Sequence, residues 1–177
     1  MPSVFILLEG NDDERFVSRV IVPLLERQNY TVRIWKYARE KRKRTIQLLK
    51  SIQASGMEYV FLRDIDEAIS IRVKKDEMVH CFEVLKEGDI VVVIMEIESW
   101  YLAGANTRLL RKIGVERGEE FTTDSVTKEQ FNRLIPQHMS RIVFMQDLLR
   151  HYNIESAMQK NRSFRYFIQR FIDKDSI

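Results

Sequence analysis

The sequence predicts an α/β fold, with a mainly parallel sheet of about four strands flanked by helices and an α-helical C-terminal extension. Apolar runs of strand length alternate with amphipathic helical segments through roughly residue 105, which is the pattern of βαβ units. Beyond that point only helical periodicity continues. We therefore expect one domain over residues 1–177, with a core of about 1–105 and a helical extension of about 106–177.

Composition excludes several classes of protein. The chain is 45% hydrophobic and 31% charged, with a net charge of only +3, which is ordinary for a globular protein. Its single cysteine excludes an internal disulfide and a cysteine-rich zinc site. No apolar run approaches the roughly 20 residues of a membrane helix, and the apolar N-terminal run is too short for a signal peptide. We expect a cytoplasmic protein with no membrane partner.

The first strand and the turn after it set the pattern for the chain. Residues 4–8 form an uninterrupted apolar run, as in a strand buried inside a parallel sheet. Glu9 and Gly10 come next, and then a helical segment over residues 13–29 with Asp12 as its expected N-cap. This arrangement puts Glu9 at the carboxyl end of a strand, where open α/β sheets bind their ligands.

Three more strands are expected, at residues 31–35, 59–62 and 90–95. A helix precedes the third strand and ends near Gly56, a typical residue just past a helix C-terminus. Another helix is expected from about Ile71 to Leu85. The last strand is the most apolar, so we expect it to be central in the sheet.

Acidic residues come directly after three of the four strands. These are Glu9, then Asp64 and Asp66, then Glu96 and Glu98. In an extended chain, the side chains of residues two positions apart point to the same side. The carboxyl ends of neighbouring parallel strands also lie at one edge of the sheet. We expect the five acids to converge there, joined by Asp12 or Asp13.

Such a cluster would either take up protons or hold a cation, because two carboxylates about 5 Å apart repel by roughly 3 kcal/mol at an effective dielectric near 20. Carboxylates without His or Cys ligands favour Mg²⁺ or Mn²⁺. One or two such ions are typical of phosphoryl-transfer sites. A single acid after a strand is more often a helix cap or turn residue, so the prediction depends on the recurrence.

The motifs Glu9-Gly10-Asn11-Asp12-Asp13 and Asp64-Ile65-Asp66 resemble those of the topoisomerase–primase (Toprim) superfamily. The segments 96–103 and 160–164 narrow the resemblance to a small Toprim-like branch. That branch is related to the OLD-family nucleases and to the RloB-like proteins of prokaryotic defence. The resemblance implies a Toprim-like Rossmannoid sheet.

The resemblance also implies roles for individual residues. Glu9 is the general acid/base or a metal ligand, and Asp13 is the second acid of the first motif. Asp64 and Asp66 bind the divalent metal, Glu96 and Glu98 complete a second metal position, and Lys160 is a late basic residue that steadies phosphate.

The chain departs from the family pattern in three ways. Asp12 stands where Thr or Ser is usual, and Arg63, next to Asp64, would partly neutralise the site. OLD-type nucleases carry an ATPase domain, and this sequence has no Gly-x-x-x-x-Gly-Lys loop. An ATPase partner would therefore be a separate protein.

A dense basic run comes after the second strand. Its basic residues are Lys36, Arg39, Lys41, Arg42, Lys43 and Arg44. Positive charge at the start of a helix opposes the helix dipole, which favours contact with the phosphates of a nucleic acid. A solvated surface loop is the alternative.

Together these features predict a divalent-metal-dependent nuclease that acts on DNA or RNA in prokaryotic defence or repair. One alternative is a non-catalytic Toprim-like subunit that binds nucleic acid or a partner. The other is a small-molecule phosphatase with Asp64 as nucleophile and Asp66 as acid/base.

Overall fold

The computed structural model describes residues 2–115 and 121–173. The chain divides after Val93 into two compact units, and each is described by itself. The second unit thus begins earlier than the expected start of the helical extension at about residue 106, because the first helix after the sheet already belongs to it. The expectation of a single domain stays a prediction.

The first unit contains a four-stranded, entirely parallel sheet, which confirms the predicted fold class. Its strands are β1 (Ser3–Leu8), β2 (Thr31–Lys36), β3 (Glu58–Asp64) and β4 (Ile90–Val93), in the order β2-β1-β3-β4. The expectation that the most apolar strand is central was wrong, because β4 ends this order. Its four residues are all buried, so its apolar character reflects burial of its faces rather than pairing along both edges.

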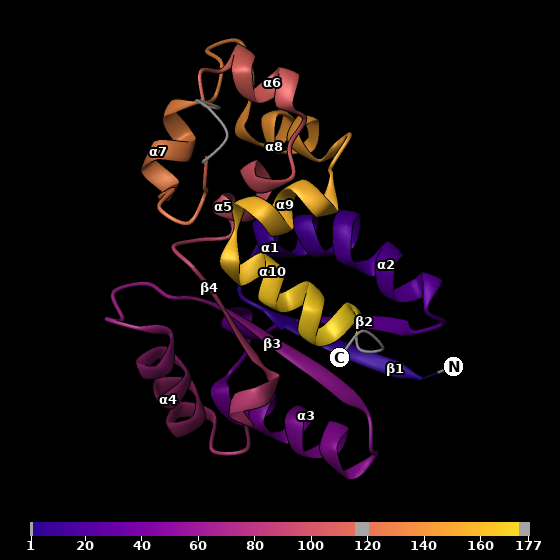
Figure 1. Ribbon diagram of the computed structural model, residues 1–177. Coiled ribbons are helices and arrows are strands. Elements are labelled where there is room, and N and C mark those ends of the chain that lie inside the picture. Colours follow the sequence, from indigo (N-terminus) through magenta and orange to yellow (C-terminus); the bar gives the residue numbers. More distant parts are fainter. Residues whose placement is uncertain (1, 116–120, 174–177) are drawn as a thin grey trace. The chain divides into compact units, whose positions relative to one another are not determined.

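Helical segments flank this sheet. They are α1 (Asn11–Phe16), the π-helical turn η1 (Val17–Ile21), α2 (Val22–Arg27), η2 (Tyr37–Arg39), α3 (Arg42–Ala54), α4 (Ile71–Phe82) and η3 (Glu87–Asp89). Figure 1 shows α3 and α4 on one face of the sheet, and α1 and α2 on the other. Gly56 has a φ of +64° just past α3, which confirms its predicted place after a helix C-terminus.

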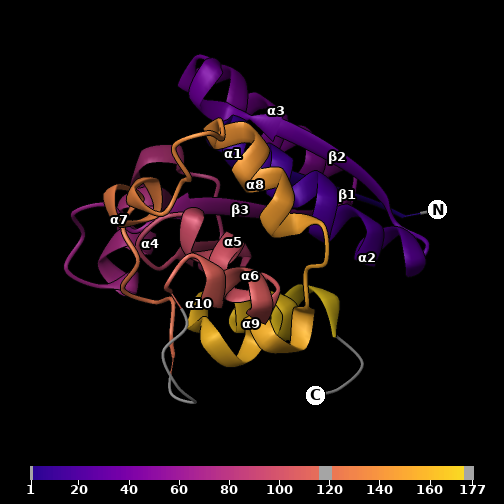
Figure 2. The same ribbon diagram turned by 90° about the horizontal axis from the view of Figure 1, so that it is seen from above.

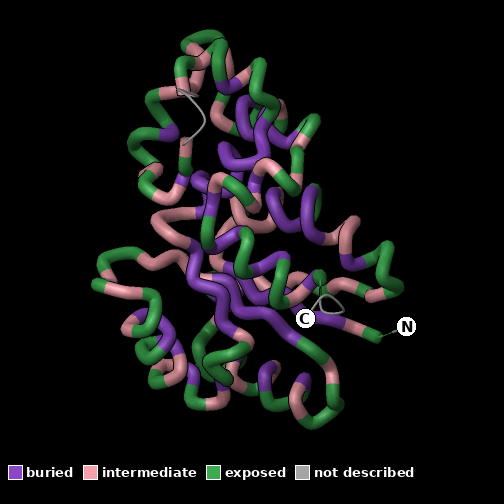
Figure 3. The backbone as a smooth tube through the Cα atoms, in the orientation of Figure 1, coloured by how far each residue is buried: buried purple, intermediate pink, exposed green. Residues whose placement is uncertain are grey.

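The core under α3 and α4 fixes the strand ends that carry the acids. Phe5 and Leu7 of β1 and Phe61 of β3 pack there against the two helices, in a cluster that also holds Tyr37. The Tyr37 and Phe61 rings stack with centroids 4.4 Å apart. Figure 3 shows β1, β3 and β4 as mostly buried stretches. Each fully buried side chain of this size contributes about 1.5–3 kcal/mol, so the positions of β1 and β3 are firmly held.

The second unit is helical. Its helices are α5 (Glu98–Ala103), α6 (Thr107–Lys112), α7 (Lys128–Arg133), α8 (Arg141–Leu149), α9 (Ile154–Lys160), α10 (Arg162–Phe167) and the π-helical turn η4 (Ile168–Ile172). Every residue of α5 is buried, and Figure 2 shows this helix among the others of its unit. Trp100 of α5 packs against Phe164 and Phe167, with ring centroids 5.2 and 5.7 Å apart. Within the described ranges, no helix has the length and apolar character needed to cross a membrane.

Candidate functional site

The turn after β1 is built by Gly10 and Asp13. Gly10 is the residue before α1, and its N–H donates to Asp13 Oδ2 at 2.9 Å, the reach-back contact of a capping box. The helix begins at Asn11, so the prediction that Asp12 is the N-cap was wrong; Asp12 instead pairs with Arg15 at 2.6 Å. Asp13 thus has a structural task at this turn, and its catalytic role stays a prediction.

The turn after β3 departs from the extended geometry expected for Asp64 and Asp66. Asp64 ends the strand, and the Ile65 N–H still donates to the Val93 carbonyl at 3.0 Å. Asp66 then turns with a φ of +48° and is exposed. The prediction that both carboxylates extend from one side of a strand was therefore wrong, because the strand ends between them.

Two cations hold the acids of the first unit together. Arg63 donates from Nη1 to Glu9 Oε1 and from Nη2 to Asp66 Oδ2, each at 2.8 Å. Lys74 of α4 donates to the same Asp66 oxygen at 2.7 Å. The first contact follows from strand register, because Leu7 pairs with Phe61 and the same register places Glu9 beside Arg63. The sequence contained no local signal for Lys74, which lies eight residues beyond Asp66.

The charges in this network change the ionisation of its members. Burial alone would raise the pKa of Asp66, but the hydrogen bond from Lys74 and the charge of Arg63 outweigh it and lower the pKa. Burial and the nearby charge of Glu9 raise the pKa of the Tyr37 hydroxyl far above its usual value. That hydroxyl donates to the Leu62 carbonyl at 3.0 Å. Tyr37 therefore stays neutral and braces β3 just before Arg63.

The fit of this arrangement to a metal is partial. Carboxylate oxygens are the donors that Mg²⁺ and Mn²⁺ prefer, and Glu9, Asp64 and Asp66 all lie at or just beyond the ends of neighbouring strands. Over residues 2–115 and 121–173, however, no group of three or more His, Cys, Asp or Glu side chains is placed to hold a metal ion. Arg63 and Lys74 neutralise Glu9 and Asp66 directly, so an ion binding these two carboxylates must compete with Arg63.

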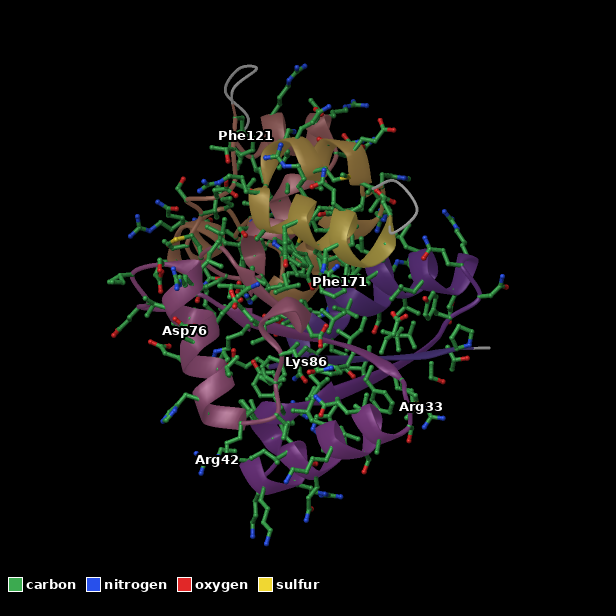
Figure 4. All side chains as sticks on the ribbon, turned by 60° about the horizontal axis from the view of Figure 1, so that its bottom comes forward. Arg33, Arg42, Asp76, Lys86, Phe121 and Phe171 are labelled. Atoms are coloured by element: carbon green, nitrogen blue, oxygen red, sulfur yellow. The ribbon has the colours of Figure 1, made fainter. Side chains whose placement is uncertain are left out.

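The basic run begins at the same edge of the sheet as Glu9. Lys36 ends β2 and pairs with Glu14 of α1 at 2.5 Å, and Arg39 donates to Asn11 at 2.7 Å. From there the run continues into the first turn of α3, where Lys41, Arg42, Lys43 and Arg44 are all exposed. Figure 4 labels Arg42 at the outer surface of this helix. The predicted position of the run, in a loop and at a helix start, is confirmed for the residues from Lys41 to Arg44, whereas Lys36 lies in β2 and Arg39 in η2.

Glu96 and Glu98 belong to the second unit and occupy different surroundings. Met95 has a φ of +61° and α5 starts at Glu98, so the prediction of an extended, same-side pair was wrong here too. Glu98 is only 2% exposed and pairs with Arg141 at 2.5 Å. Glu96 accepts the Lys128 N–H at 2.6 Å. Burial raises the pKa of Glu96, partly offset by that hydrogen bond. A metal position shared by these two acids with Glu9 and Asp64 stays a prediction.

The late motif 160–164 builds the inside of the second unit. Asn161 is fully buried; its Nδ2 donates to Ser99 and Thr123, and its Oδ1 accepts from Ser163 Oγ and the Phe164 N–H. Ser163 in turn accepts from the Ile94 N–H at 3.1 Å and the Trp100 indole at 2.8 Å. The motif therefore fixes the segment that carries Glu96.

Lys160 lies at the end of α9. Its ammonium group is 5.7 Å from the centroid of the Phe121 ring, and its carbonyl accepts the Thr123 N–H at 2.8 Å. The predicted contact of Lys160 with phosphate stays a prediction. Sequence reasoning missed Asn161, although an Asn just before a helical run is a recognisable N-cap signal.

Comparisons of the chain with protein-family models, with curated proteins and with solved structures found no match.

Proposed function

We propose that this protein is a Toprim-like nuclease that uses Mg²⁺ or Mn²⁺ to cleave phosphodiester bonds of DNA or RNA. One observation carries the proposal. At one edge of a parallel sheet, the acids after β1 and β3 lie beside an exposed basic segment that starts at the end of β2. Acids and a phosphate-binding surface at the same sheet edge are what metal-assisted cleavage of a polyanion requires.

In this proposal Asp64 and Asp66 hold the ion, and Glu96 and Glu98 provide a second metal position. The bound ion supplies an activated water and stabilises charge on the phosphate oxygens. Glu9 takes up or returns the proton, and the basic residues between Lys36 and Arg44 hold the nucleic-acid backbone. Lys160 steadies phosphate, and an ATPase, if one takes part, acts as a separate partner.

Arg63 has a specific task in the absence of the ion. It neutralises Glu9 and Asp66 at 2.8 Å each, and so removes the repulsion that two adjacent carboxylates would suffer. Metal binding then requires Arg63 to release at least one of them.

The same contacts favour a second candidate function, a non-catalytic subunit that binds nucleic acid through the basic run. In that case Arg63 and Lys74 replace the ion permanently, and Glu9 and Asp66 serve only to hold the sheet edge together. The two candidates differ in whether a divalent ion enters the site.

A cleavage assay separates the two. Purified protein is incubated with supercoiled plasmid and with single-stranded RNA, in Mg²⁺, in Mn²⁺ and in EDTA. The nuclease should cut with metal only, and Asp64→Asn should reduce the rate by at least about 100-fold, since it removes a metal ligand. Asp76→Asn, at an exposed position of α4, is the matched control and should cut normally. Binding in EDTA with no cleavage under any condition would establish the second candidate instead.

A further inference from the structure

Two adjoining hollows lie in the second unit, away from its buried Glu98 ion pair. Each has a volume of about 520 Å³. They share Asn106, Arg108 and His151 as a common wall, so they lie next to each other, and we call the two together the α6 hollow. Its other walls come from the end of α8 and the start of α9.

The charge of the α6 hollow is strongly positive. Arg108, Lys112 and Arg150 line it, and the one acid among its described lining residues, Asp147, pairs with Arg150 at 2.9 Å. Arg108 and Lys112 are exposed and stand four residues apart on α6, where like charges repel. Among the residues that the structure describes, no acidic side chain forms an ion pair with either of them. An anion from outside would relieve that repulsion.

The frame of the hollow is already ordered. The Asn106 side chain caps α6 by accepting the Arg108 N–H at 2.8 Å, and the Asn153 side chain caps α9 by accepting the Ser156 N–H at 2.7 Å. The Asn153 N–H donates to the Gly104 carbonyl at 2.7 Å, which ties these two walls together. A side chain at Gly104 would meet the Tyr152 ring at 2.4 Å, so glycine permits this close approach.

We propose that the α6 hollow binds the phosphate groups of a nucleic-acid strand. The identity of the strand as partner rests on the proposed function. A strand fits better than a small nucleotide, because pockets that bind small molecules usually have aromatic walls. In the described part of the chain, no Phe, Tyr or Trp lines this hollow, and Arg and Lys contacts to phosphate dominate the affinity for strands.

Strand binding measured in EDTA tests the proposal. Fluorescence anisotropy follows a labelled 20-nucleotide single strand, of DNA and of RNA, titrated with protein at several salt concentrations. The double variant Arg108→Gln/Lys112→Gln should bind about 10-fold more weakly at low salt, and its salt slope should fall by about 1.4, for two lost phosphate contacts. The control Arg133→Gln/Arg165→Gln removes the same charge at exposed helix positions that do not line the hollow, and should lose less than about 2-fold.

Several results would overturn this inference. Equal losses in both double variants would mean that only the net charge matters, and no loss in the hollow variant would mean that the strand does not touch it. If AMP or inorganic phosphate binds as tightly as the strand by calorimetry, and displaces it, the hollow is a small-anion site. Melting followed by circular dichroism establishes that both variants are folded. A wild-type protein that binds the strand in EDTA but never cuts it would overturn only the proposed nuclease activity.

Discussion

Two turns of this protein share the sequence pattern acid-Ile-acid but differ in how far their acids are buried. Asp64-Ile65-Asp66 lies at the end of β3 in the first unit, and Glu96-Ile97-Glu98 lies beyond β4 at the start of the second. The Asp66 side chain is 44% exposed and pairs with Arg63 and Lys74. The Glu98 side chain is 3% exposed and pairs with Arg141. The same acid-Ile-acid spacing thus gives a surface carboxylate in one turn and a buried one in the other.

The difference comes from the next segment of chain after each motif. After Asp66 the chain continues into a loop that includes the exposed Ile69. Glu98 instead begins a helix in which every residue is buried, and this helix carries Glu98 inside with it. Acid spacing alone therefore does not predict how far a carboxylate is exposed, because the burial of the next element decides it.

The largest loss of stability is expected from replacing Asn161, because Asn161 anchors the turn that contains the buried Glu98. Asn161→Ala should destabilise the second unit by about 3 kcal/mol, because it removes the acceptor of the buried Phe164 N–H and the hydrogen bonds to Ser99 and Thr123. The measurement is urea unfolding followed by Trp100 fluorescence in a Trp35→Phe background, since these are the two tryptophans of the chain. Gln159→Ala, at an exposed position of α9, is the control. Equal midpoints for both would contradict the anchoring role.

A smaller effect is expected from the two acids themselves. Glu98→Ala should cost about 2 kcal/mol, because it leaves the partly buried Arg141 guanidinium without its carboxylate. Asp66→Ala should cost less, about 1 kcal/mol, because the Asp66 side chain is itself 44% exposed and the buried Lys74 keeps a second carboxylate, Glu77, at 3.7 Å. Urea unfolding followed by circular dichroism measures both. Similar losses for the two variants would mean that the contrast in burial has no energetic consequence.

Much of the fold could be predicted from residue patterns. The strands are apolar runs such as Val4–Leu8, and Gly56 marks the end of α3, because local sequence determines buried strands and helix ends. The order of the sheet was less predictable. β4 looks central by composition, yet strand composition reports burial and not the number of paired neighbours.

The candidate site was predicted only in part. The acids after β1 and β3 do lie on adjacent strands, since parallel pairing follows from the fold class. Arg63 was expected to neutralise the site in part, but its contact with Glu9 was missed because that contact depends on strand register. Lys74 was missed because it reaches Asp66 from a separate helix. Neither relation is visible in a one-dimensional motif. The left-handed turn at Asp66 was missed for a similar reason, since Asp tolerates that conformation without requiring it.

Replacing Arg63 tests whether the acids around Asp66 bind a metal ion. Arg63→Gln removes the positive charge beside Glu9 and Asp66, so Mn²⁺ should bind about 10-fold more tightly if those acids are ligands. Titration calorimetry with Mn²⁺ measures this. Arg44→Gln, which removes an exposed charge paired with Glu40, should leave the affinity unchanged. An Arg63 variant that still binds no Mn²⁺ would count against the metal site and favour the non-catalytic candidate.

The smallest effect is the pH dependence of stability, and it should have opposite signs at the two turns. The lowered pKa of Asp66 adds stability above the usual aspartate value of about 4, and that stability is lost as the pH falls through the folded-state pKa. The raised pKa of Glu96 means that ionisation costs stability as the pH rises from the usual glutamate value, about 4.3, through the folded-state pKa.

Relative to wild type, Asp66→Asn should therefore lose stability between acid pH and pH 7, while Glu96→Gln should gain it. Each change should be below about 1 kcal/mol, because both carboxyls are partly exposed. Urea midpoints across this pH range measure them, and changes of the same sign in both variants would show that the two turns do not differ in ionisation.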